Sequence, residues 1–81
     1  MDNRGYSKAL IDANQSASVS SLGVLLGRYC VSRDISAIEV AQYFLVSKMT
    51  IYKWFCGKSE PRQRHRDRIE TMLRQGGWIE Q

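Results

Sequence analysis

The stretch from Ser36 to Gly57 constrains the fold of this chain more than any other part of the sequence. Ser36 is followed three residues later by Glu39, the S-x-x-E pattern of a capping box that begins a helix. Apolar residues then recur at helical spacing, and Ser47 is placed to cap a second helix over 48–55 that Gly57 ends. The stretch therefore predicts two short helices joined by a tight turn.

The sequence on either side of this stretch also predicts helices. Apolar residues at helical spacing favour a helix over about 18–32, in which Gly23 and Gly27 permit another helix to pack closely. A further helix is expected to begin at Pro61, which suits the first helical position, and to end at Gly76. Its apolar stripe consists of Ile69, Met72 and Leu73.

The length of 81 residues allows a single domain. Residues 1–17 are polar and almost aperiodic, so we expect a flexible N-terminal segment there and an all-α domain of four to five short helices over 18–81. No apolar run approaches the roughly 18 residues of a membrane helix, and the first residues do not resemble a signal peptide. We therefore expect a cytoplasmic protein with no membrane partner.

Positive charge is concentrated in one segment. The residues from Lys48 to Arg68 include seven Lys and Arg but only two acids, so this segment carries +5 and the remainder of the chain −1. Such clustering is expected for a polyanionic partner, and charge alone favours a solvated charged face equally.

Residue types that serve catalysis and metal binding are scarce. Cys30 and Cys56 are far apart and lack CxxC spacing, so we expect two reduced thiols rather than a disulfide or zinc site. The one histidine, His65, falls on the inward stripe of the last helix and is expected to be packed. We predict no catalytic residue, no metal, no cofactor and no small-molecule substrate.

The second of the two central helices has a clear outward face. If Ile51 and Trp54 point to the core, then Met49, Tyr52, Lys53 and Cys56 lie on the opposite side of the helix. Two helices joined by a tight turn present such a face to the major groove of DNA. The residues predicted to read bases are Lys48, Met49, Tyr52 and Lys53.

At this point the sequence resembles a known family. The residues from Ala41 to Gly57, AQYFLVSKMTIYKWFCG, followed by Pro61, resemble the lambda-repressor-like helix-turn-helix family of Cro- and C1-type regulators. The resemblance covers roughly 22–73. It implies sequence-specific binding of double-stranded DNA by a small phage or bacterial repressor, acting in the cytoplasm of the bacterial or phage-infected cell.

The chain departs from the family pattern in three respects. Leu45 stands where the family usually has a glycine with a left-handed backbone, so either Leu45 is strained or the turn has another shape. Ala37 replaces a frequent glutamine, which removes a common phosphate contact. Only one clear helix follows Pro61, where many relatives have two.

The start of the last helix contains an electrostatic conflict. Arg62, Arg64 and Arg66 crowd the end where the helix dipole disfavours cations, and Arg64 and Arg68 are like charges at i,i+4. Because locally unfavourable choices tend to occur at functional sites, we expect these arginines to contact phosphates. The residues predicted to bind phosphate are Ser47, Thr50, Lys58, Arg62, Arg64 and Arg68.

A homodimer is expected because one small reading unit touches few base pairs and a small core gains from association. Trp78 and Ile79 are the predicted dimer contacts, since they follow Gly76 and Gly77 with little of their own domain to cover them. The alternative is that this tail folds back onto the helix over 18–32.

Two other functions stay open at this level. The chain is compatible with a helix-turn-helix-shaped protein-interaction module that inhibits a host enzyme, and with non-specific nucleic-acid binding. Positive charge on the same face as Tyr52 and Lys53 favours DNA binding. Arg64 and Arg68 on a different face would favour the protein-interaction module.

Overall fold

Residues 6–79 are described by the computed structural model and form five α-helices, with no strand among them. The helices are α1 (Lys8–Ser16), α2 (Leu22–Ser32), α3 (Ala37–Phe44), α4 (Lys48–Phe55) and α5 (Gln63–Gln75). The expected all-α class is confirmed.

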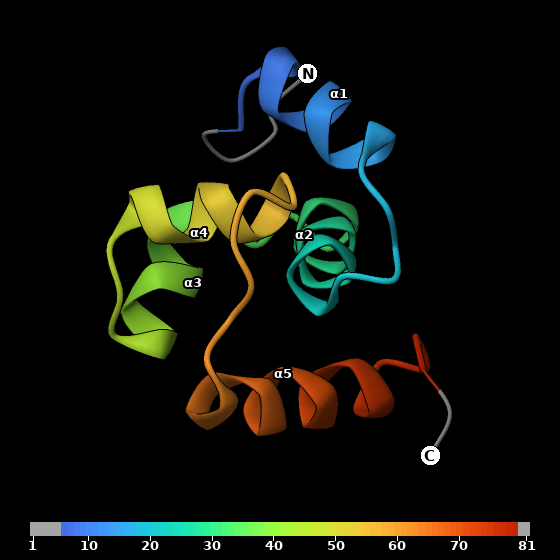
Figure 1. Ribbon diagram of the computed structural model, residues 1–81, viewed down its shortest axis with the longest axis vertical. Helices are drawn as coiled ribbons and strands as arrows, with labels where there is room; N and C mark the ends of the chain where they lie inside the picture. The colour runs from blue at the N-terminus through green and yellow to red at the C-terminus, as the bar shows by residue number, and fades with distance from the viewer. Residues whose placement is uncertain (1–5, 80–81) are drawn as a thin grey trace.

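Helix α2 is the centre of the packing. It contacts α1, α4 and α5, and α3 packs against α4. Figure 1 shows α1 and α5 on opposite sides of the layer that contains α2, α3 and α4. The largest fully buried side chains come from α2 to α5, and they are Phe44, Phe55, Leu26, Ile51, Ile69, Leu73, Val24 and Cys30.

The predicted caps of α3 and α4 are confirmed. The Glu39 backbone N–H donates to Ser36 Oγ at 3.1 Å, and the Ser36 N–H donates to Glu39 Oε1 at 3.0 Å, which completes the capping box. At the start of α4, Ser47 Oγ accepts from the Thr50 N–H at 3.1 Å. Gly57 has φ of +77° just after α4, a conformation that glycine adopts at no steric cost.

The turn between α3 and α4 contains a strained residue. Leu45 has φ 58° and ψ 46°, the left-handed conformation, and its side chain is 86% exposed. The next residue, Val46, donates its N–H to the Ala41 carbonyl at 3.0 Å and so closes the end of α3. Of the two geometries that the sequence left open, the turn therefore has the strained one.

Helices α2 and α4 approach as closely as the two glycines of α2 suggested. A Cβ added at Gly23 would lie 2.8 Å from the Trp54 carbonyl oxygen. One added at Gly27 would lie 2.7 Å from Phe55 Cγ and 2.5 Å from Asn14 Nδ2. Real Cβ contacts do not occur at such distances, so the packing requires glycine at both positions.

Two helices begin later than expected. α2 begins at Leu22 rather than near Ser18, because Ser18 and Ser20 form a local turn in which their hydroxyls lie 2.8 Å apart. α5 begins at Gln63 rather than at Pro61, and Pro61 is buried in the preceding loop.

The expectation that residues 1–17 lie outside the domain is wrong for residues 6–17. Helix α1 is capped by Ser7, whose Oγ accepts from the Leu10 N–H at 3.1 Å. The Tyr6 hydroxyl donates to the Ile35 carbonyl at 2.7 Å, and Asn14 Nδ2 donates to the Phe55 carbonyl at 2.7 Å. These bonds attach both ends of α1 to the body of the protein. Residues 1–5 lie outside the described part of the chain.

The C-terminal tail folds back, as the alternative to the dimer contact proposed. The rings of Trp78 and Tyr29 meet edge-to-face at a centroid distance of 5.7 Å, and the Trp78 N–H donates to the Leu73 carbonyl at 2.8 Å. Ile79 also packs against the core. Trp78 and Ile79 therefore have a partner in their own domain, which removes the reason for assigning them to a dimer contact.

Candidate nucleic-acid interface

The register of α4 is as predicted. Ile51 and Trp54 face inward, with Trp54 only 3% exposed, and Trp54 is therefore a core residue. Lys48, Met49 and Lys53 are exposed, and Met49 is 61% exposed despite being apolar. Three of the four predicted base-reading side chains thus lie on the open surface of α4.

The fourth predicted base-reading residue, Tyr52, lies differently. Its side chain is half-buried and packs against the core. Cys56, at the end of α4, is also half-buried. Residues of α1 line the same hollow as this side of α4. Between the two helices is the α1–α4 hollow, a space of about 450 Å³ to which α1 contributes Ala9, Leu10 and Ala13. On the other side it is bounded by Met49, Tyr52, Lys53, Cys56 and Lys58.

Two hydroxyls mark the N-terminus of α4. Ser47 Oγ and Thr50 Oγ1 lie 3.0 Å apart and form a hydrogen bond in which either atom can donate. Ser47 is exposed and Thr50 is half-buried, next to the exposed ammonium side chain of Lys48. Helix N-termini of this kind attract anions, because free N–H groups and the helix dipole point outward.

Arg64 and Arg68 of α5 lie next to the α3–α4 turn. Arg68 Nη1 donates to the Tyr43 carbonyl at 3.4 Å, and its guanidinium lies 5.6 Å from the centroid of the Tyr43 ring. Both arginines, together with Phe44, Leu45 and His65, line a second hollow of about 380 Å³, which we call the arginine hollow.

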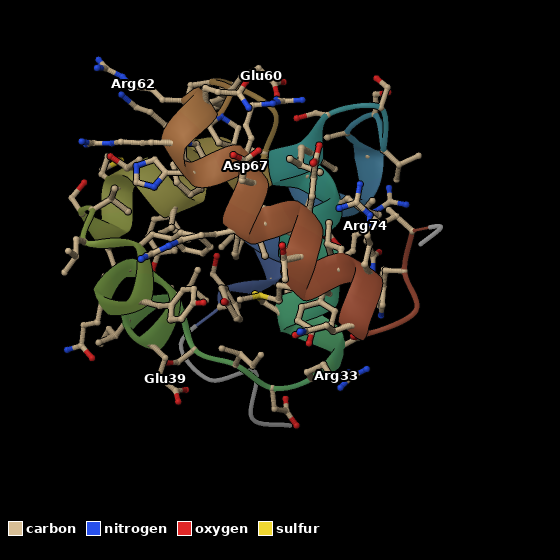
Figure 2. The ribbon with its side chains drawn as sticks, turned by 90° about the horizontal axis from the view of Figure 1, so that it is seen from below. Arg33, Glu39, Glu60, Arg62, Asp67 and Arg74 are labelled. Carbon is tan, nitrogen blue, oxygen red and sulfur yellow. The ribbon has the colours of Figure 1, made fainter. Side chains whose placement is uncertain are left out.

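Most cations of the basic segment have no acidic partner among residues 6–79. Of the seven Lys and Arg between Lys48 and Arg68, only Arg66 forms an ion pair, with Glu60 at 3.8 Å. Figure 2 shows Arg62 extending outward from the start of α5, near Glu60. The unpaired members are Lys48, Lys53, Lys58, Arg62, Arg64 and Arg68.

Four of these six cations fall into two groups that line different hollows. Lys53 and Lys58 line the α1–α4 hollow, whereas Arg64 and Arg68 line the arginine hollow beside the turn. The structure does not bring the two groups into one hollow. Arg64 and Arg68 therefore lie apart from Tyr52 and Lys53, the arrangement that adds weight to the protein-interaction alternative.

His65 is packed, as predicted. It is 7% exposed, and its ring lies 5.3 Å from that of Trp54 and 5.9 Å from that of Phe44. Burial lowers the pKa of His65 below its ordinary value of 6.5, and the positive charges of Arg64, Arg68 and Arg62 lower it further. Arg64 Nε donates to His65 Nε2 at 3.4 Å, which requires the neutral imidazole.

The two cysteines are free thiols, as expected. Cys30 is buried in α2, and this burial raises the pKa of its thiol to about 12, which keeps it protonated and unreactive. Within the described part of the chain, no three His, Cys, Asp or Glu residues lie close enough together to hold a metal ion. No helix there has both the length and the apolar character needed to cross a bilayer.

Sequence reasoning missed the contribution of α1 to this surface. Tyr6, Leu10 and Asn14 recur at every fourth residue, a helical spacing, and Ser7 precedes the helix as a cap. This pattern was available in the sequence. It is weak because Asn14, a polar residue, occupies the most buried position of the helix.

Comparison with known proteins adds no assignment. The chain matches no model of a protein family, no curated protein sequence and no solved structure.

Proposed function

We propose that the chain is a sequence-specific double-stranded DNA-binding regulator in which α3 and α4 act as a helix-turn-helix and α4 enters the major groove. The observation that carries the proposal is the set of six unpaired cations on α4, α5 and the loop between them. Unpaired cations on consecutive elements around an exposed helix suit a polyanion, because phosphates supply the charge that the protein itself does not.

A helix in the major groove is compatible with two separate groups of cations, although their separation does not favour DNA over a protein partner. The major groove is bordered by one phosphate backbone on each side, so a helix within it meets phosphates on both flanks. Lys58 lies on the α1 side of α4, and Arg64 and Arg68 lie on the side of the turn. Lys48, Met49 and Lys53 then face the base edges, and Tyr52 contributes from the edge of that surface.

The regulatory part of the proposal comes from the resemblance to Cro- and C1-type proteins. On that basis the chain acts as a repressor in a bacterial or phage-infected cell and binds as a homodimer to half-sites roughly 34 Å apart. The packing of Trp78 on Tyr29 of its own domain removes the reason for placing the dimer surface at the tail.

Selection of bound sites from random duplex DNA, followed by footprinting, tests the proposal. Enrichment of a pseudo-palindrome supports both specific recognition and a dimer. Arg64→Ala and Arg68→Ala should weaken binding to all sequences alike, and each lost phosphate contact should reduce the salt slope by about 0.9. Retention of unselected DNA alone, with no enriched motif, contradicts sequence specificity and leaves non-specific binding.

A protein-interaction module is the second candidate. The separation of Arg64 and Arg68 from Lys53 favours it, as do exposed apolar side chains at Tyr43, Leu45 and Met49. This candidate predicts no measurable affinity for duplex DNA even at low salt, where phosphate contacts are strongest. A fluorescence anisotropy titration with pooled random duplexes at low salt separates the two functions.

A further inference from the structure

The α1–α4 hollow is a consequence of how α1 is attached. The helix is fixed at one end by the bond from Tyr6 to the Ile35 carbonyl and at the other by the bonds of Asn14 to the Val24 and Phe55 carbonyls. Between these attachments α1 lines the hollow with two alanines, Ala9 and Ala13, and with the half-buried Leu10. α1 is therefore held beside α4 without filling the space between them.

The lining of the hollow is apolar with one cationic edge. Ala9, Leu10, Ala13, Met49 and the Tyr52 ring supply mainly apolar surface, and Ser7 and Cys56 complete the uncharged part of the lining. No acidic residue lines the hollow. A volume of about 450 Å³ falls within the range of small-molecule sites in proteins, roughly 300–1,000 Å³.

Lys53 and Lys58 supply the charge. Both are exposed lysines at the hollow, and neither has an acidic partner among residues 6–79. The Lys58 backbone N–H donates to the Lys53 carbonyl at 2.9 Å, which keeps the two residues together at the end of α4. A molecule complementary to this hollow has an apolar body and an anionic head.

We propose that the α1–α4 hollow binds a medium-chain fatty acid, with the acyl chain against Ala9, Ala13 and Met49 and the carboxylate on Lys53 and Lys58. Burial of the acyl chain supplies affinity, and the paired ammonium groups fix the orientation. Because the bound carboxylate occupies Lys53, and Lys53 and Met49 are also proposed base-reading residues, bound fatty acid and bound DNA exclude each other. This second statement rests on the proposed function, whereas the binding site itself does not.

The methionines of the chain allow a direct test of binding. Met49 lines the hollow, while Met72 lies in a different hollow beside Cys30 and Phe44 and serves as an internal control. With [13C]methyl-methionine protein, decanoate below its micellar concentration should shift the Met49 methyl signal saturably and leave that of Met72 in place. An unmoved Met49 signal, or equal shifts at both residues, overturns the site.

Ligand analogues and lysine variants test whether the carboxylate binds at the cationic edge of the hollow. Decanol and decylamine should bind more weakly than decanoate, because neither brings a negative charge to the lysines. Lys53→Gln and Lys58→Gln should each weaken decanoate binding about tenfold, the size of a charged hydrogen bond. Lys48→Gln, which removes an exposed lysine of α4 outside the hollow, should not. Equal effects of all three lysine variants overturn the assigned orientation.

Filling the hollow separates this inference from the proposed function. Ala13→Leu should abolish the Met49 shift, and because Ala13 lies on α1 outside the proposed base-reading set, DNA affinity should stay at the parental value. Decanoate should then release DNA from the parent protein but not from Ala13→Leu. If no duplex is bound, the proposed function fails and the site is judged on Met49 alone. Decanoate that shifts Met49 without releasing DNA overturns the exclusion.

Discussion

Helices α2 and α1 lie against α4 in opposite ways. On the α2 side, Gly23 and Gly27 bring the backbones so close that a single added carbon would lie 2.5–2.9 Å from atoms of Asn14, Trp54 and Phe55. On the α1 side, a hollow of about 450 Å³ lies between the two helices, and Ala9, Ala13 and Met49 in its lining are exposed. One contact has no spare volume, and the other has enough for a small ligand.

This difference separates the contact that stabilises the fold from the surface of the proposed function. Close packing gains dispersion energy and tolerates no added volume, so the α2–α4 contact is expected to carry much of the fold's stability. The contact between α1 and α4 gains little dispersion energy, yet it leaves Met49 and Lys53 accessible. In a small domain with a marginal core, the residues that stabilise the fold are then separate from those proposed to contact DNA. The surface of α4 can therefore vary without unfolding the protein.

The largest effect is expected from filling the tight contact. Gly27→Val places two methyl groups against Phe55 and should destabilise the fold by about 3 kcal/mol, the upper end of the cost of overpacking. Ala13→Leu adds a similar volume on the hollow side and should change the free energy of unfolding by less than about 0.5 kcal/mol. Urea unfolding followed by circular dichroism compares them, and equal losses would remove the distinction between the two contacts.

The next largest effect concerns recognition rather than stability. Lys53→Ala should weaken binding to the selected DNA site by about 1–3 kcal/mol and relax the preference at one base pair. Lys8→Ala is the matched control, because it removes the same charge from an exposed lysine that pairs with Asp12 on α1. Binding titrations that show equal losses for the two variants would point to net charge alone.

A smaller effect, on the pH dependence of stability, is expected from His65. Its pKa is lowered in the fold by burial and then by the charges of Arg64, Arg68 and Arg62. Above its ordinary pKa of 6.5 the imidazole is neutral in both the folded and unfolded states. As the pH falls through 6.5, the unfolded chain takes up a proton that the folded chain resists, so stability declines.

The control for this titration is His65→Phe, which keeps an aromatic ring beside Trp54 and Phe44. The difference in free energy of unfolding between parent and variant should shift in favour of the variant between pH 7.5 and pH 5.5. A difference that does not change with pH would mean that His65 titrates in the fold as it does in water.

What the sequence predicted depended on how local the determining interaction was. The capping box of α3, the serine cap of α4 and the inward position of Trp54 follow from residues within one or two turns, and all are confirmed. The packing of α1 was missed because it depends on bonds from Tyr6 to Ile35 and from Asn14 to Phe55, which no local pattern reveals.

The candidate site shows the same limit. Helical periodicity placed Met49 and Lys53 on the outer face of α4 and they are exposed there, but it did not predict that Tyr52 is half-buried and packs against the core. The i,i+4 spacing of Arg64 and Arg68 put them on one face of α5. Their position beside the α3–α4 turn, apart from Lys53, required the tertiary structure.

The smallest effect is expected at Leu45. Its left-handed backbone costs a non-glycine residue about 1–2 kcal/mol, and its side chain, 86% exposed, gives little burial in return. Leu45→Gly removes the strain but adds roughly 0.5–1 kcal/mol of chain entropy to be lost on folding, so a net gain of about 0.5 kcal/mol is expected.

Asp34 offers an internal comparison for this prediction, because it has the same φ of 58° in the α2–α3 connection. Aspartate tolerates the left-handed region better than leucine, since its short polar side chain can hydrogen-bond locally. Asp34→Gly should therefore gain less than Leu45→Gly, or lose stability. A lower melting temperature for Leu45→Gly would mean that the Leu45 side chain, although exposed, stabilises the turn by packing against the other residues that line the arginine hollow.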